Sequence, residues 1–216
     1  TFLVFALTDK AAGPHKGMSA FLIDRNTPGI TVQPEIKRMG IRGASNSEVV
    51  YTDVRVPASD LLGGEGKGFK IAMKALDGGR IGMASQAVGI AEGAIDLAVA
   101  YAKERVQFKK PISANQGIQW YFADIATSTE AAKMLTLQAA DLRQRGQNIG
   151  KLAAMAKYYA SENAVTVTNK ALQIHGGYGY MKEYAIERMY RDARITTLYE
   201  GTSEVQKMVI SRAVLS

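Results

Sequence analysis

The chain has 216 residues, enough for one large domain or one domain plus part of another, and its composition, 47% hydrophobic and 22% charged, predicts a sizeable core rather than disorder. The absence of cysteine excludes disulfides, a thiol nucleophile and Cys-based metal sites, and the two histidines, His15 and His175, are too few and too far apart in the sequence to suggest a metal site. The net charge is +7 but Lys and Arg are scattered, and no unbroken apolar run approaches the ~20 residues that span a bilayer, so we expect no nucleic-acid or membrane partner.

The first sixty residues have the pattern of β structure. Short segments rich in β-branched and aromatic residues are separated by turn signals such as Gly13-Pro14 and Pro28-Gly29. The predicted strands are 2–8, 18–24, 30–34 and 48–56. These strands have no closing partners, and the chain opens within one of them without an initiator Met. We therefore expect the chain to be part of a longer protein.

Helical periodicity begins after the glycine-rich segment 63–68. Small or apolar residues recur at steps of three and four along three stretches. The stripes are Ala84, Val88, Ala91, Ile95, Ala98 and Ala102; Tyr121, Ile125, Ser128, Ala132, Leu135, Ala139 and Leu142; and Ala153, Ala156, Ala160, Ala164, Val167, Ala171 and Ile174. They predict three long amphipathic helices that pack closely as a bundle. Shorter helices are predicted at 183–191 and 202–215.

Residues 191–206 carry the sharpest chemical signal. Glu200 and Gly201 stand directly before a predicted helix that begins with Thr202 and Ser203, both good capping residues. Backbone N–H groups at such a terminus can receive an anion or a polarised oxygen, and Gly201 allows close approach. A carboxylate held there can act as a general base. A solvated Glu before an ordinary capped helix is the alternative that these residues leave open.

Several segments resemble the acyl-CoA dehydrogenase family, in the same order and over essentially the whole chain. The run Tyr-Glu-Gly-Thr-Ser-Glu at 199–204, preceded by Arg-Asp-Ala-Arg-Ile at 191–195, is similar to the family's active-site signature. The other similar segments are 39–42 with 47–48 and 54–57, 64–69 with 76–81, 105–108 with Gln116, and 173–179. The similarity is greatest to the short-chain, butyryl-CoA type.

The resemblance implies a mainly α fold with a partial β portion, in which a C-terminal up-down helical bundle is preceded by the end of a β-barrel-like domain. Residues 1–62 would be the C-terminal part of the family's middle β-domain, and residues 63–216 its C-terminal helical bundle domain. The rest of the family's architecture would lie outside this chain, a C-terminal fragment. The isolated chain is therefore expected to bind FAD weakly or not at all and to be inactive.

The resemblance also implies a reaction, the FAD-dependent α,β-dehydrogenation of a short-chain acyl-CoA to the trans-2-enoyl-CoA. Glu200 would be the catalytic base that takes the α-proton, and its backbone N–H would hydrogen-bond the thioester carbonyl. In the isovaleryl and long-chain branches of the family the base stands at the position of Gly79. A glycine cannot abstract a proton, so the resemblance leaves Glu200 as the base of this chain. The substrate-binding positions would be Asp77, Gly78, Gly79, Arg80 and Gly201. For Arg80 a surface ion pair remains the alternative.

FAD would be the cofactor, held by residues of two subunits, and no metal is implied. The positions reaching the FAD of a neighbouring subunit would be Arg105, Gln116, Gln173, Ile174, His175, Gly176 and Gly177. Thr202, Ser203 and Glu204 would lie near the FAD of the same subunit. The family usually has Gly at the position of Lys109, so the turn after Arg105 is expected to differ.

The partners implied are an acyl-CoA substrate, an electron-transfer flavoprotein and further copies of the chain in a homotetramer. The enzyme would lie in the cytoplasm of a bacterium or the mitochondrial matrix of a eukaryote. Three alternatives stay open: an acyl-CoA oxidase, which gives its electrons to oxygen; a non-catalytic helical module, which only oligomerises; and, least favoured, a nucleic-acid binder.

Overall fold

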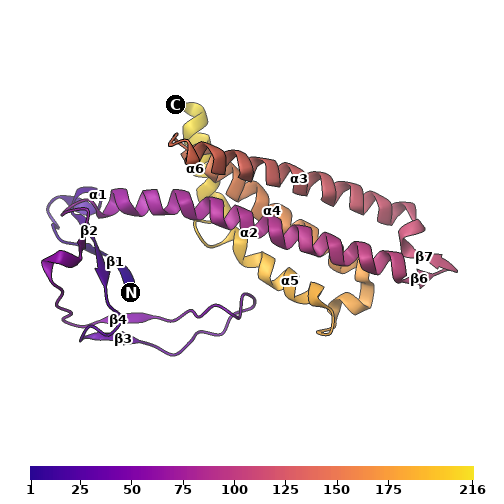
Figure 1. Cartoon of the computed structure of the whole chain (residues 1–216), viewed down its shortest axis with the longest axis horizontal. Coiled ribbons are helices and arrows are strands. Elements are labelled where there is room, and N and C mark those ends of the chain that lie inside the picture. Colours follow the sequence, from indigo (N-terminus) through magenta and orange to yellow (C-terminus); the bar gives the residue numbers. More distant parts are fainter. The chain divides into compact units, whose positions relative to one another are not determined.

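The computed structural model describes residues 1–216, which divide into two compact units. Unit 1 comprises residues 1–38 and 42–76, and unit 2 comprises residues 39–41 and 77–216. Most of the strands lie in unit 1 and the helical bundle lies in unit 2, so the predicted mainly α fold with a small β portion is confirmed (Figure 1). Helix α2 (Gly68–Glu104) begins in unit 1 and runs into unit 2, and the predicted domain boundary at residues 62/63 stays a prediction.

Unit 1 is built from two small antiparallel sheets. Strand β2 pairs with β1 on one side and β5 on the other, and β3 pairs with β4. The bounds are β1 Phe2–Leu7, α1 Gly13–Lys16, β2 Met18–Ile23, β3 Ile30–Val32, β4 Val49–Tyr51 and β5 Leu61–Leu62. All four predicted strands are present. The fourth ends at Tyr51, short of the predicted residue 56, because Asp53 takes a left-handed conformation (φ 49°) that ends the ladder.

Unit 2 is an assembly of helices around α4. Helix α4 packs against α3, α5 and α6, and a two-stranded hairpin follows α2. The bounds are β6 Val106–Gln107, β7 Lys110–Pro111, α3 Gln116–Gln144, α4 Gly150–His175, α5 Ala185–Arg194 and α6 Ser203–Leu215. Phe108 and Lys109 form the hairpin turn with φ values of 51° and 65°, as the two central residues of a type I′ turn require. Lys109 therefore adopts the conformation that glycine would take without strain.

The core of unit 2 is lined by alanines on α2, α3 and α4. The small methyl groups of these alanines let the helices approach closely. The predicted stripe on α4 is buried throughout, whereas Tyr121 at the start of α3 is 37% exposed, with the Lys170 ammonium 5.3 Å from its ring centre. By length and composition α2 passes a test for a membrane-spanning helix. Its buried alanines instead place it as a core helix of the bundle.

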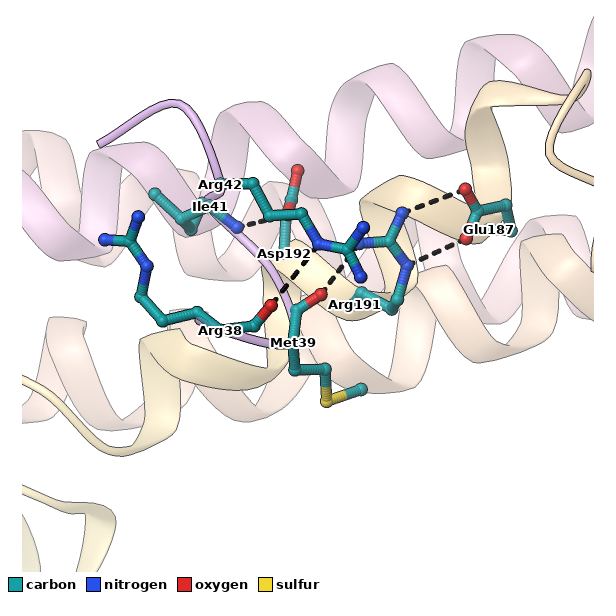
Figure 2. A network of polar contacts seen from close by, with 7 residues as sticks. All are labelled: Arg38, Met39, Ile41, Arg42, Glu187, Arg191 and Asp192. Carbon is teal, nitrogen blue, oxygen red and sulfur yellow. Dashed lines mark hydrogen bonds and ion pairs between the residues drawn. The ribbon is translucent and has the colours of Figure 1, made fainter. Parts of the chain in front are cut away.

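A three-residue loop segment, Met39–Ile41, is held by α5 within unit 2 (Figure 2). The Ile41 N–H donates to Asp192 Oδ1 at 2.6 Å, and Arg191 Nη1 donates to the Met39 carbonyl at 2.8 Å. A Cβ at Gly40 would lie 2.5 Å from the Arg191 carbonyl oxygen, so only glycine fits between the two contacts. The Met-Gly-Ile segment at 39–41 and the Arg-Asp segment at 191–192, far apart in the sequence, are thus joined by these two hydrogen bonds.

Candidate functional site

Glu200 lies in a strained turn between α5 and α6. It has φ 54°, and Gly201 follows with φ 90°. A non-glycine residue in the left-handed region costs about 1–2 kcal/mol, and such outliers concentrate at functional sites. Thr202 caps α6 as predicted, its hydroxyl oxygen accepting from the Val205 N–H at 3.4 Å. The carboxylate is therefore presented from a fixed turn just before a helix N-terminus.

The half-buried carboxylate of Glu200 rests on the bare backbone of α2 at Gly79. A Cβ added at Gly79 would lie 2.4 Å from Glu200 Oε2 and 2.9 Å from Cδ, which no ordinary contact allows. The absence of a side chain at this position thus makes room for the carboxylate. The structure brings Gly79 and Glu200 together although they are far apart in the sequence. The space beside Gly79 holds either the Glu200 carboxylate or a side chain at position 79, but not both.

Two buried side chains hold the carbonyl groups of the turn. Lys157 of α4 donates from Nζ to the Gly201 oxygen at 2.7 Å. Gln206 of α6 donates from Nε2 to the Glu200 and Gly201 oxygens at 3.2 and 3.0 Å. Desolvation by burial lowers the pKa of Lys157 to about 8, against the opposing pull of Glu162 and Glu200. The turn is thus tied to two helices at once.

The Glu200 backbone N–H, in contrast, donates to no acceptor within the chain. Buried or half-buried N–H groups are almost always paired in folded proteins. An unused donor on the same residue as the carboxylate leaves a hydrogen bond available to a ligand. A base and an oxyanion donor can therefore act from one residue, as the resemblance implies.

Of the predicted substrate positions on α2, Gly79 lies against this turn, and the other three have different neighbours. Arg80 is buried and pairs through Nη1 with Asp77 at 2.7 Å, while its Nε is buried without a partner. The ion pair expected as the alternative role of Arg80 is therefore present, though it is not a surface pair. Gly78 lies beneath the guanidinium of Arg143 from α3, 2.8 Å from where a Cβ would be.

The predicted positions at the start of α6 differ in environment. Ser203 is buried and its hydroxyl donates to Glu162 of α4, which ties the helix start to the bundle. Glu204 is exposed, and hydrogen bonds from its own backbone N–H and from the Thr202 hydroxyl lower its pKa. Tyr199 donates its hydroxyl to Gln86 of α2, and burial raises its pKa.

A second group of predicted residues lines a cavity of about 500 Å³ at the other end of α4. The Arg105 guanidinium lies 5.3 Å from the centre of the Tyr178 ring, and His175 stacks on Tyr101 at 4.4 Å. His175 Nδ1 is 2.8 Å from the Ala171 carbonyl oxygen, which can only accept, so this nitrogen carries the proton. The predicted residues along this cavity are Arg105, Ile174, His175, Gly176 and Gly177. Gln116 and Gln173 are exposed and do not line it.

The two groups are well separated within one chain. Gly79 and Tyr101 lie about six turns apart on α2, or roughly 33 Å at the rise of an α-helix. One dinucleotide cannot contact both Glu200 and this cavity. The separation agrees with the expectation that the two groups serve cofactors of different subunits.

Lys157, Gln206 and Arg143 were not singled out by the sequence. Lys157 had a signal, because it is a charged residue amid the buried alanines of α4, where lysine is rarely found. Arg143 had none, because its contact with Gly78 joins two helices that only the tertiary fold brings together. Gln206 lies at the end of the 191–206 stretch, and its contacts with the preceding turn are local, but the sequence did not assign it a role. No group of three or more His, Asp or Glu gathers anywhere in the chain as a metal site would need.

Comparison with known proteins places these features in a family context. The profile described as "Acyl-CoA dehydrogenase, C-terminal domain" matches residues 66–215. Acryloyl-CoA reductase (NADH) of Anaerotignum propionicum is 59% identical over 213 residues, which cover 99% of this chain and 54% of that protein. Subunit CarC of the caffeyl-CoA reductase-Etf complex of Acetobacterium woodii is 50% identical and is covered to 56%.

The solved structure of butyryl-CoA dehydrogenase from Megasphaera elsdenii superposes with a TM-score of 0.97 at 50% identity, over 99% of this chain and 56% of that one. The agreement extends over the strands of unit 1 as well as the bundle. The chain spans about half the length of the curated relatives it matches.

Proposed function

Because the chain belongs to the acyl-CoA dehydrogenase family, we propose that it forms the C-terminal part of a flavoenzyme that converts a short-chain acyl-CoA to the trans-2-enoyl-CoA. The observation that carries this proposal is the Glu200 carboxylate lying against the bare backbone of Gly79. A side chain at position 79 would exclude the carboxylate. The pair therefore supports Glu200 as the base.

The chemistry assigned to Glu200 is removal of the α-proton. Such a proton is weakly acidic, and it becomes removable when hydrogen bonds stabilise the charge that develops on the thioester oxygen. The unpaired Glu200 N–H is the protein donor that we assign to this oxygen. Because the carboxylate and the N–H belong to one residue, a turn held by Lys157 and Gln206 fixes both together.

The cavity beside Arg105 fits part of a flavin dinucleotide. Arg105 offers charged donors suited to a pyrophosphate, and Gly176 and Gly177 leave the backbone open to close approach. Thr202, Ser203 and Glu204 would hold the FAD that serves Glu200 of the same chain. A bound flavin supplies the hydride acceptor. Since the cavity is remote from Glu200, we assign it to the FAD of a neighbouring subunit in a homotetramer.

Arg80 is assigned to the acyl-CoA. Its Nη1 is held by Asp77, and its buried Nε is a donor without a partner in the chain. A guanidinium held in place by an ion pair suits a carbonyl or phosphate oxygen of the substrate. Gly78 and Gly201 would border the same substrate.

A second direction of reaction is supported by the 59% identity to a protein named acryloyl-CoA reductase (NADH). In that direction the protonated Glu200 returns a proton to the α-carbon of a 2-enoyl-CoA, so the same residues serve both. We propose an electron-transfer flavoprotein as the redox partner, since the CarC relative belongs to a complex named with Etf. We place the enzyme in the cytoplasm of a bacterium, or in the mitochondrial matrix of a eukaryote.

The test uses the complete protein that contains this chain. Anaerobic butyryl-CoA should bleach its flavin absorbance, and crotonyl-CoA should be the product. Hydrogen peroxide formed in air at the rate of substrate loss would show an oxidase instead. If acyl-CoA left the flavin absorbance unchanged, the result would favour a non-catalytic assembly module. Stoichiometric yellow colour in the isolated chain would overturn the expectation that residues 1–216 alone do not hold FAD.

A further inference from the structure

Lys157 is the largest side chain that is completely buried in the structure. It lies on α4 between alanines of the bundle core, where an apolar residue of similar length would pack without loss of hydration. Burial lowers its pKa to about 8, so most of the side chain stays charged at neutral pH. A buried ammonium in this place opposes folding, and its presence calls for a role other than packing.

No carboxylate lies within ion-pair distance of the Lys157 ammonium, so it is not half of a buried salt bridge. The charged groups that act on it more remotely come from three other places in unit 2 and from its own helix. They are Arg80 on α2, Glu162 on α4, Glu200 before α6 and Glu204 on α6. Its one hydrogen bond in the chain goes to the carbonyl oxygen of Gly201, at 2.7 Å.

That carbonyl belongs to the strained turn that presents Glu200. Gln206 supplies a second set of hydrogen bonds to the same turn. Its amide nitrogen faces the two carbonyl oxygens while its own Oε1 is buried without a partner. Two buried donors, one from α4 and one from α6, thus converge on two successive carbonyl groups whose residues have φ of 54° and 90°.

We infer that Lys157 is a positioning residue, whose hydrogen bond to the Gly201 carbonyl holds the Glu200–Gly201 turn in its left-handed conformation and so keeps the Glu200 carboxylate against Gly79. The inference rests on the proposed function for its catalytic consequence, and on the turn geometry alone for its structural one. The hydrogen bond offsets the cost of a positive φ at Glu200. Without it the turn relaxes, and the carboxylate and the Glu200 N–H move together.

The experiment replaces Lys157 with Met in the complete enzyme, which keeps the length of the side chain and removes the donor. Hydrogen–deuterium exchange is followed in the peptide that contains residues 199–202, and flavin reduction by butyryl-CoA is followed by stopped flow. Lys151→Met is the matched control, because Lys151 is exposed on the first turn of the same helix. Gln206→Met and the double variant complete the set.

In Lys157→Met we expect exchange at residues 199–202 to be at least tenfold faster, with the rest of α4 protected as before. Flavin reduction should slow by about 10- to 100-fold, the loss expected for a displacement near 1 Å, while acyl-CoA affinity changes less than threefold. Lys151→Met should match the wild type in both. The effects of Lys157→Met and Gln206→Met should be less than additive, because both side chains hold one turn.

Unchanged hydrogen–deuterium exchange at residues 199–202 in Lys157→Met would overturn the inference, whatever the rate of flavin reduction. Equal protection and a uniformly lower stability would show a packing role instead. If the wild-type enzyme did not react with acyl-CoA while the exchange result held, the proposed function would fail and the positioning role would stand. If the variant did not fold, the Gln206→Met exchange would decide, since the same turn should loosen there.

Discussion

A methyl group at position 79 is the smallest change that reaches the proposed base. Gly79→Ala places a Cβ 2.4 Å from Glu200 Oε2 and 2.9 Å from Cδ. Ordinary van der Waals contact begins near 3.4 Å, so the carboxylate must retreat by about 1 Å. Position 79 lies inside α2, and the retreating atoms are the far end of a flexible side chain.

The consequences for folding and for rate have opposite signs. Replacing glycine by alanine inside a helix stabilises the folded state by up to about 1 kcal/mol, which offsets the small cost of moving the side chain. A base displaced by about 1 Å loses about 100-fold in rate. We therefore expect Gly79→Ala to melt at the wild-type temperature or above it, and to reduce its flavin about 100-fold more slowly.

The assay is stopped-flow flavin reduction by butyryl-CoA in the complete enzyme, with thermal melting of the same samples. Gly89→Ala is the matched control on α2, because a Cβ there meets nothing within 4 Å. It should keep the wild-type rate. The reasoning would be refuted by a Gly79→Ala enzyme that retained more than half of the wild-type rate, since the methyl and the carboxylate would then not compete for space.

Three further changes have expected outcomes. Because its pKa falls from 10.5 to about 8 on folding, Lys157 opposes folding fully below pH 8, and this penalty fades toward pH 10.5. At pH 7 the free energy of unfolding of Lys157→Met should thus exceed that of the wild type by roughly 2 kcal/mol, less the contribution of the lost hydrogen bond. In thermal melts at pH 9.5 this difference between variant and wild type should be smaller. Asp192→Ala leaves the Ile41 N–H unpaired and should cost about 1–3 kcal/mol in urea unfolding, whereas Asp192→Asn keeps an acceptor and should lose less. Lys109→Gly relieves a left-handed lysine and should raise the melting temperature slightly; a lower one would contradict the turn assignment.

The helical bundle could be predicted from the sequence because the pattern of small and apolar residues that forms it is local and periodic. Alanines at steps of three and four on α2 and α4 face the core as expected, and the capping role of Thr202 follows from its place before an apolar run. The end of β4 was not accessible, because it depends on a left-handed Asp53, and β5 is too short to show a period.

The candidate site could be predicted in part for the same reason. The signature around Glu200 stands in one stretch, so resemblance was enough to single it out, and the structure adds that Gly79 lies beneath the carboxylate. The hydrogen bonds that fix the turn come from Lys157 of α4 and Gln206 of α6. The role of Lys157 arises only when α4 packs against the turn, and no spacing in the sequence expresses that contact.

The central claim is that the Glu200 carboxylate removes the α-proton, and α-proton exchange measures this step most directly. The complete enzyme, incubated in D2O with an acyl-CoA, should transfer solvent deuterium to the α-carbon, as followed by mass spectrometry. Glu200→Gln should bind the same acyl-CoA and its flavin yet lose exchange by at least 1000-fold, while Glu130→Gln, an exposed carboxylate on α3, should exchange at the wild-type rate. Undiminished exchange in Glu200→Gln would contradict the assignment of the base.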